Sequence, residues 1–219
     1  MKNFSTYINE KLKITKNMLD NQHNNGYEYV DLGLPSGTMW SVCNLGGEEE
    51  TDYGIYFQWG DTELKDHEKY TESDNKFINI YNLVEKYNLN DGLEELEPED
   101  DAAHVNMGGK WRIPTPEQFN ELKKYTTNEW RHDYNGSGVN GRLYTSKQNG
   151  NTIFFPANGI CNKDTKYAQR NDLCVYWTNK LVSKRKIAAF CYTMYKNSFI
   201  DANQTERYLG CGIRPCFVK

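Results

Sequence analysis

Apolar residues in the second half of this chain occur in short runs separated by glycine, asparagine and aspartate, and this spacing restricts the fold most. Such runs have the length and the aromatic and β-branched content of strands. Nearer the N-terminus, residues 29–34 and 40–45 predict a hairpin around the Pro35-Ser36-Gly37 turn. The later runs that predict strands are 142–147, 152–156, 175–178, 188–195 and 211–218.

Two helix starts interrupt these strands. Thr115 precedes Pro116 and Glu117, which predicts a capped helix from Pro116 to about Tyr125. The run of aspartates and alanines at 100–103 predicts a second start, and a further helical pattern lies near 79–87. Two main helices among many short strands, with no internal repeat, indicate a single α+β domain.

A separate amphipathic pattern covers residues 3–13. A helix this short is marginal in water, so we expect it to dock on its own domain or on another protein. The polar stretch 21–26 predicts a linker. The chain therefore divides into a docking helix with its linker, 1–26, and a binding domain, 27–219. The apolar residues expected on the docking helix are Phe4, Tyr7, Ile8 and Leu12.

Charge and hydropathy exclude some partners. The net charge of -4 argues against nucleic acid, whose phosphates attract basic surfaces. No apolar run is long enough for a membrane span. The first 16 residues lack the apolar core of a secretory signal, so we expect synthesis in a cytoplasm.

Metal-binding patterns are also missing from the sequence. The six cysteines are scattered, which favours free buried thiols and leaves disulfides open, and the four histidines have no ligand spacing. The acidic run 94–101 could offer oxygens to calcium, but a solvated loop that caps the next helix explains it better, because no calcium-loop pattern is present. We expect no cofactor and no metal.

From about residue 27 to 219 the chain resembles the Fibrobacter succinogenes major paralogous domain family, which is abundant in gut Bacteroidota and their phages. The shared motifs lie at 29–40, 53–62, 99–103, 108–115, 149–159, 176–178 and 207–215. Arg112-Ile113-Pro114-Thr115 and Gly212-Ile213-Arg214 are in turn similar to motifs of the formylglycine-generating enzymes. This resemblance implies an α+β, C-type-lectin-like domain with short mixed strands and two main helices. It also implies a variable C-terminal ligand-binding face, here about 177–208.

The oxidase chemistry of the formylglycine-generating enzymes is not supported. Those enzymes use two cysteines separated by four residues, and Cys191 has Lys196 at the partner position. Cys211 and Cys216 have this spacing, but an offset of five places them on opposite faces of a strand. We therefore expect a binding protein and not an enzyme.

Tyrosine, asparagine and basic residues concentrate in the C-terminal part, and these residue types suit a recognition surface. Their positive charge on an acidic protein favours an anionic ligand such as an acidic polysaccharide. Tyr53, Tyr56, Phe57 and Trp59 could form a sugar-stacking platform, but core packing is the preferred interpretation, as for Trp40, Trp111 and Trp177. The expected ligand-binding residues are Asn179, Lys180, Lys184, Arg185, Tyr192, Tyr195, Asn197, Asn203, Gln204, Arg207 and Tyr208.

The functional hypothesis is a phage virion protein, in a receptor-binding or capsid or tail surface role, that recognises a host cell-surface polysaccharide or protein. Its docking helix would bind other virion proteins, and a homo-oligomer stays open. The alternatives are a purely structural virion protein, a bacterial surface adhesin and an oxidase of the formylglycine-generating type. The virion is the expected location, with the cytoplasm or the cell surface as alternatives.

Overall fold

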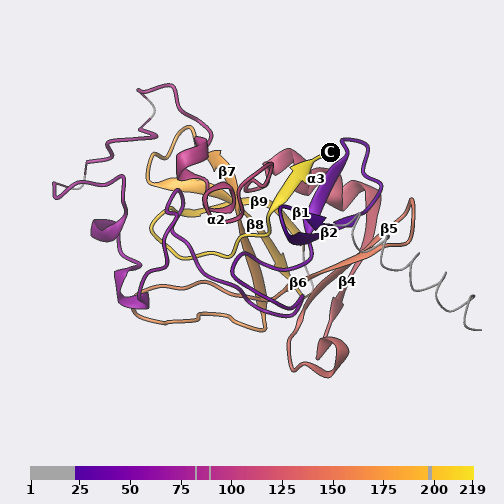
Figure 1. The fold of residues 1–219 in the computed structure, drawn as a ribbon. Helices are drawn as coiled ribbons and strands as arrows, with labels where there is room; N and C mark the ends of the chain where they lie inside the picture. Colours follow the sequence, from indigo (N-terminus) through magenta and orange to yellow (C-terminus); the bar gives the residue numbers. More distant parts are fainter. Residues whose placement is uncertain (1–22, 82, 89, 197–198) are drawn as a thin grey trace, which may run out of the picture.

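The structure is a computed structural model that describes residues 23–81, 83–88, 90–196 and 199–219 (Figure 1). The predicted docking helix, with Phe4, Tyr7, Ile8 and Leu12, lies outside the described residues. Asn197 of the predicted ligand-binding face lies outside them too. In the described part of the chain, neither helix has the length or apolar character needed to cross a membrane.

Three small antiparallel sheets make up most of the described fold. Long irregular segments connect them, and the segment between β3 and α2, purple to magenta in Figure 1, runs from the middle of the molecule to its left side. The first sheet contains β1 (His23–Asn24), β2 (Tyr27–Asp31), β3 (Thr38–Ser41) and β10 (Cys216–Val218). The second contains β4 (Thr126–Arg131), β5 (Gly141–Ser146) and β6 (Thr152–Pro156). The third contains β7 (Leu173–Leu181), β8 (Ala188–Tyr195) and β9 (Phe199–Glu206).

Both predicted helix starts are confirmed. The side chain of Asp101 accepts a hydrogen bond from the His104 backbone N–H at the start of α2 (Ala102–Met107). Thr115 and Gln118 form a reciprocal capping box before α3 (Pro116–Tyr125), as the local sequence predicts. Single 3-10 turns occur at His67–Lys69, Glu72–Asp74, Pro98–Asp100 and Tyr134–Gly136.

The expected C-type-lectin-like α+β fold is wrong, because the described residues are mostly β. Their two α-helices have only six and ten residues. The helical pattern near 79–87 is instead a tight loop, where Asn79 N–H donates to Leu83 O at 3.0 Å and Ile78 pairs with Val84. Three strands, β1, β4 and β9, were not predicted, and β1 lies in the predicted linker. Pairing with a neighbouring strand stabilises these polar segments in place of an apolar run.

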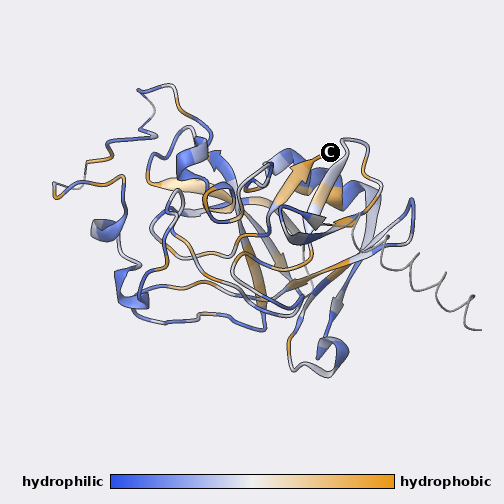
Figure 2. Ribbon diagram, in the orientation of Figure 1, coloured by the Kyte–Doolittle hydropathy of each residue, from blue (hydrophilic) through white to orange (hydrophobic). Residues whose placement is uncertain are grey.

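The third sheet separates two hydrophobic cores. Along β7, Val175 and Trp177 face one core, while Cys174 and Tyr176 between them face the other. Successive strand residues point to opposite faces, so a continuous apolar run marks a sheet that is buried on both sides. Hydrophilic residues concentrate in the outlying loops, including the loop between β4 and β5 (Figure 2). Little of the surface of β7 and β8 is therefore accessible to a ligand.

Candidate functional site

Two of the predicted ligand-binding residues are interior and cannot meet a ligand. Tyr192 is fully buried and its ring stacks on Phe119 at a centroid distance of 4.5 Å. Arg207 is also fully buried, and its guanidinium donates to the backbone carbonyls of Lys86 and Lys186, both at 2.8 Å. Arg207 thus binds two connecting loops to the end of β9, and its assignment to a binding face is wrong.

The positive charge on the exposed part of the predicted face is largely offset by neighbouring carboxylates. Lys184 and Arg185 lie in the turn between β7 and β8, and Arg185 pairs with Glu206 at 3.2 Å. At the end of β7, the half-buried Asn179 and Lys180 contact Glu95 at 3.4 and 3.9 Å. The expected positive surface is therefore reduced, because acidic residues distant in the sequence lie beside it.

The remaining predicted residues are divided between two places. Asn203 and Gln204 lie on β9, where the Asn203 side chain accepts from the Gln204 backbone N–H at 2.8 Å. Tyr195 packs at the margin of a hydrophobic core. Tyr208 is half-buried and lines a hollow on a different surface, which has the properties of a binding site.

This surface, here called the tyrosine face, contains Tyr56, Tyr70, Tyr167 and Tyr208. It has two open hollows, of about 140 and 310 Å³, and Tyr70 lines both of them. The smaller hollow is lined by Gly54, Ile55, Tyr56, Leu64, Lys65, His67, Tyr70, Cys161, Lys166 and Tyr167. The larger is lined by Tyr70, Thr71, Glu72, Asn162, Lys163, Asp164, Tyr208 and Leu209.

Backbone pairing between distant segments builds the tyrosine face. Cys161 pairs with Gly210, and Ile160 with Ala168, which closes a short hairpin beside the C-terminal segment. Gly210 leaves no room for a side chain, since an added Cβ would lie 2.6 Å from the Tyr70 ring. The ring of Tyr70 therefore packs directly on this backbone and is fixed between the two hollows.

Arg170 holds the exposed tyrosine of this face in place. Its guanidinium carbon lies 3.4 Å from the ring centroid of Tyr167 and 4.4 Å from that of Tyr53. The same group donates to the hydroxyl of Tyr56 at 3.0 Å. Cation–π contacts of this kind contribute about 0.5–2 kcal/mol each. Tyr167, which is 38% exposed, is thus a preorganised aromatic surface at the edge of the smaller hollow.

The smaller hollow is basic. Lys65, Lys166 and His67 line it, and no carboxylate is among its lining residues. Lys65 is oriented by an ion pair with Asp61 and by donation to the Asp74 carbonyl at 2.7 Å. Burial raises the pKa of the Cys161 thiol to about 11, so this lining cysteine stays protonated and is a poor nucleophile. The chemistry available is stacking, hydrogen bonding and attraction of an anion.

The residues of this site are only partly predictable from the sequence. The core interpretation is confirmed for Tyr56, Phe57 and Trp59, which are buried. Tyr53 is half-buried against Arg170. It is also confirmed for Trp40, Trp111 and Trp177, all fully buried. Tyr167 and Arg170 were missed, since a tyrosine and an arginine in a polar segment look the same as any solvated loop.

The acidic run and the two C-terminal cysteines have defined surroundings among the described residues. The ammonium of Lys86 lies 2.5 Å from Glu97, 3.6 Å from Glu99 and 2.7 Å from Asp100, so a cation already sits among these carboxylates. Cys211 and Cys216 lie in different hydrophobic cores, which confirms that they point to opposite sides.

Comparison with known proteins adds no relative: no protein-family model, no curated protein and no solved structure matches this chain.

Proposed function

We propose that this chain is a non-enzymatic binding module that recognises a surface glycan through the tyrosine face. The observation that carries the proposal is Tyr167, clamped by Arg170 and exposed beside a hollow lined by Lys65 and Lys166. A sugar ring has an apolar C–H face that packs on an aromatic ring, and polar edges that need hydrogen-bonding partners. The tyrosine face offers both within one surface.

The shape of the face favours an extended glycan over a small enclosed ligand. Its two hollows are open, and they flank the turn at 162–165. Most small-molecule sites bury nearly all of the ligand, which neither hollow could do. A polysaccharide could instead place one unit on Tyr167 and a neighbouring unit near Tyr208.

Rigidity supports the same conclusion. Ordering a mobile side chain on binding costs about 0.5–1.5 kcal/mol. Tyr167 and Tyr70 are already held by Arg170 and by the Gly210 backbone, so this cost is largely avoided. Lys166 in the lining of the smaller hollow favours a sugar that carries a carboxylate, whereas the charge of Lys65 is offset by Asp61.

The biological setting of this binding belongs to the same proposal and rests on the sequence resemblance alone. It is a phage virion protein at a receptor-binding, capsid or tail surface that recognises the capsule of a gut host. A bacterial surface adhesin would use the tyrosine face in the same way. A purely structural virion protein would not need it. Mass spectrometry of purified virions separates either virion role from the bacterial adhesin, and glycan binding separates the two virion roles.

The oxidase alternative has less support. Cys191, its candidate nucleophile, is 1% exposed, and burial raises the pKa of this thiol to about 12. A nucleophilic or copper-binding cysteine needs an accessible thiolate. Copper titration of the purified protein with air-dependent turnover of a thiol substrate would revive the oxidase.

The test is binding of the purified protein to a panel of capsular polysaccharides from gut Bacteroidota. On each polysaccharide that binds, Tyr167→Ala should weaken the affinity about 30-fold, as for a contact residue worth about 2 kcal/mol. Tyr167→Phe keeps the ring and should bind nearly as the wild type does. Tyr81→Ala removes an equally large tyrosine that is 77% exposed on another loop and should change nothing. Unchanged binding by Tyr167→Ala would refute the proposal.

A further inference from the structure

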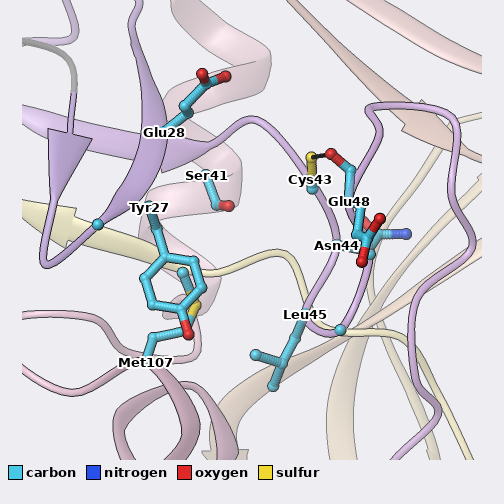
Figure 3. A pocket seen from close by; sticks show the side chains of 11 residues that line it. Tyr27, Glu28, Ser41, Cys43, Asn44, Leu45, Glu48 and Met107 are labelled. Atoms are coloured by element: carbon cyan, nitrogen blue, oxygen red, sulfur yellow. Dashed lines mark hydrogen bonds between the residues drawn. The ribbon is translucent and has the colours of Figure 1, made fainter. Parts of the chain in front are cut away.

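A third hollow, of about 230 Å³, lies between the start of β2, the segment that follows β3, and the end of α2. It shares no lining residue with the two hollows of the tyrosine face. Figure 3 shows Tyr27 and Met107 on one side of it and Cys43 and Asn44 on the other. The full lining is Gly26, Tyr27, Glu28, Ser41, Cys43, Asn44, Leu45, Gly46, Gly47, Glu48 and Met107.

The walls of this hollow are preformed. Asn44 is buried, and its amide donates to the carbonyl of Tyr53 at 3.0 Å and to the hydroxyl of Tyr176 at 3.2 Å. The Tyr27 ring is 42% exposed and makes an edge contact with Trp111 at 6.5 Å between centroids. A ligand would therefore meet an aromatic wall and an apolar floor of Leu45 and Met107 that need little rearrangement.

The charged lining residues of the hollow have one sign, and one cation, the buried Arg214, lies behind the wall, where it donates to Ser41 O and Asn44 Oδ1. Glu28 and Glu48 are the charged residues of its lining, and no lysine or arginine is among them. Burial raises the pKa of the Cys43 thiol; Arg214 opposes this rise, and the smaller effects of the Asp52, Glu28 and Glu50 carboxylates add to it. Several carboxylates thus act on the wall of the hollow from different segments.

We infer that this hollow binds an organic ammonium group on an apolar stem, such as a lysine side chain. The ammonium would be attracted by the glutamates and by the face of Tyr27, and the stem would lie on Leu45 and Met107. An anion of the same size would be repelled by the two glutamates. The volume suits one side chain or one small amine.

Cys43 gives a direct readout, because it lies in the wall of the hollow and is half-buried, whereas the other five cysteines are buried. Methanethiosulfonate reagents convert a thiolate to a mixed disulfide and release methanesulfinate, whatever group they carry. We would measure their rates with Cys43 for a trimethylammonium, a neutral and a sulfonate reagent. Each rate is divided by the rate of the same reagent with a small free thiol.

The normalised rate of the ammonium reagent should exceed that of the sulfonate reagent by about tenfold or more at low salt. The ratio should fall towards one in the Glu28→Gln/Glu48→Gln double variant. A Cys43→Ala/Ser137→Cys protein reports the effect of net charge alone, from an exposed loop between β4 and β5. An equal ratio at Cys43 and Cys-substituted Ser137 would overturn the inference.

Protection identifies the source of the ammonium. Butylammonium and N-acetyl-lysine methylamide should both slow the neutral reagent at Cys43, whereas butyrate should not. Stronger protection by the lysine derivative assigns the hollow to a protein lysine, and stronger protection by butylammonium assigns it to a free amine. Equal protection by butyrate, or none by any of the three, would overturn the inference. Tyr27→Leu keeps an apolar wall and should weaken protection by either amine.

Discussion

Replacing Arg214 by methionine should destabilise the fold severely, although the new side chain is also unbranched and is more apolar. Arg214 is fully buried, and its guanidinium donates to Asn44 Oδ1 at 2.8 Å, to Phe154 O at 2.8 Å and to Ser41 O at 3.1 Å. It also donates to the Val42 carbonyl. One side chain therefore satisfies acceptors from the end of β3, the segment after it, and β6.

The magnitude follows from these acceptors. Each buried acceptor left without a donor costs about 1–3 kcal/mol, and removal of the buried cation offsets part of the total. We expect a loss of about 3–5 kcal/mol in the free energy of unfolding, near the upper end for single substitutions. At about 2–4 °C per kcal/mol for a chain of this size, the melting temperature should fall by about 6–20 °C.

Urea unfolding followed by tryptophan fluorescence measures this loss. Arg185→Met is the matched control, because Arg185 is exposed and pairs with Glu206 at the surface. A surface pair of this kind contributes at most about 1 kcal/mol. If Arg214→Met unfolds within 1 kcal/mol of the wild type, the hydrogen-bonding role assigned to this buried arginine is wrong.

Two further predictions concern pH and packing. Burial raises the pKa of Cys191 from 9.0 to about 12, so the folded chain holds this proton more tightly than the unfolded chain. Its contribution to stability is complete below pH 9 and should fall by about 1.4 kcal/mol per pH unit between those two values. Urea unfolding at increasing pH measures this fall, and Cys191→Ala should lower the slope by that amount; an unchanged slope in that variant contradicts the assignment. Gly210→Ala should cost about 1–3 kcal/mol, because its Cβ would displace the Tyr70 ring, and glycan binding should weaken as well. Thermal melts and polysaccharide binding check both effects, and a fully active, equally stable variant would refute the packing described.

Local sequence signals predicted the elements that depend on neighbouring residues. Thr115 and Gln118 are three residues apart and cap α3 without help from the rest of the chain. The apolar run at 188–195 matches the bounds of β8, since both faces of this strand are buried. Such elements can be predicted without knowing which residues pack against them.

Features that depend on distant segments were not predictable in this way. Arg207 is buried because its guanidinium donates to the carbonyls of Lys86 and Lys186. No local sequence pattern connects these residues with Arg207. The carboxylate of Glu95 offsets the positive charge of Lys180, because the backbone at Glu95 pairs with the end of β7. The fold class was wrong for the same reason: a resemblance in short motifs does not fix how the long connecting segments pair.

The candidate site illustrates the limit most clearly. Tyr167 and Arg170 acquire their arrangement from Tyr53 and Tyr56, more than a hundred residues earlier. The predicted face shares only Tyr208 with the tyrosine face. Residue type indicated a recognition surface in the C-terminal half, but tertiary contacts decide which of those residues are exposed and rigid.

The binding site is tested most directly by comparing the tyrosine face with the C-terminal face predicted from the sequence, on one polysaccharide. Binding of the best capsular polysaccharide would be measured by calorimetry for Tyr167→Ala and for the Lys184→Ala/Arg185→Ala double variant, with melting curves to confirm that both fold. The account predicts a loss of about 30-fold for Tyr167→Ala and a change of less than about threefold for the double variant. The opposite result, with binding lost only in the double variant, would contradict the tyrosine face as the binding site.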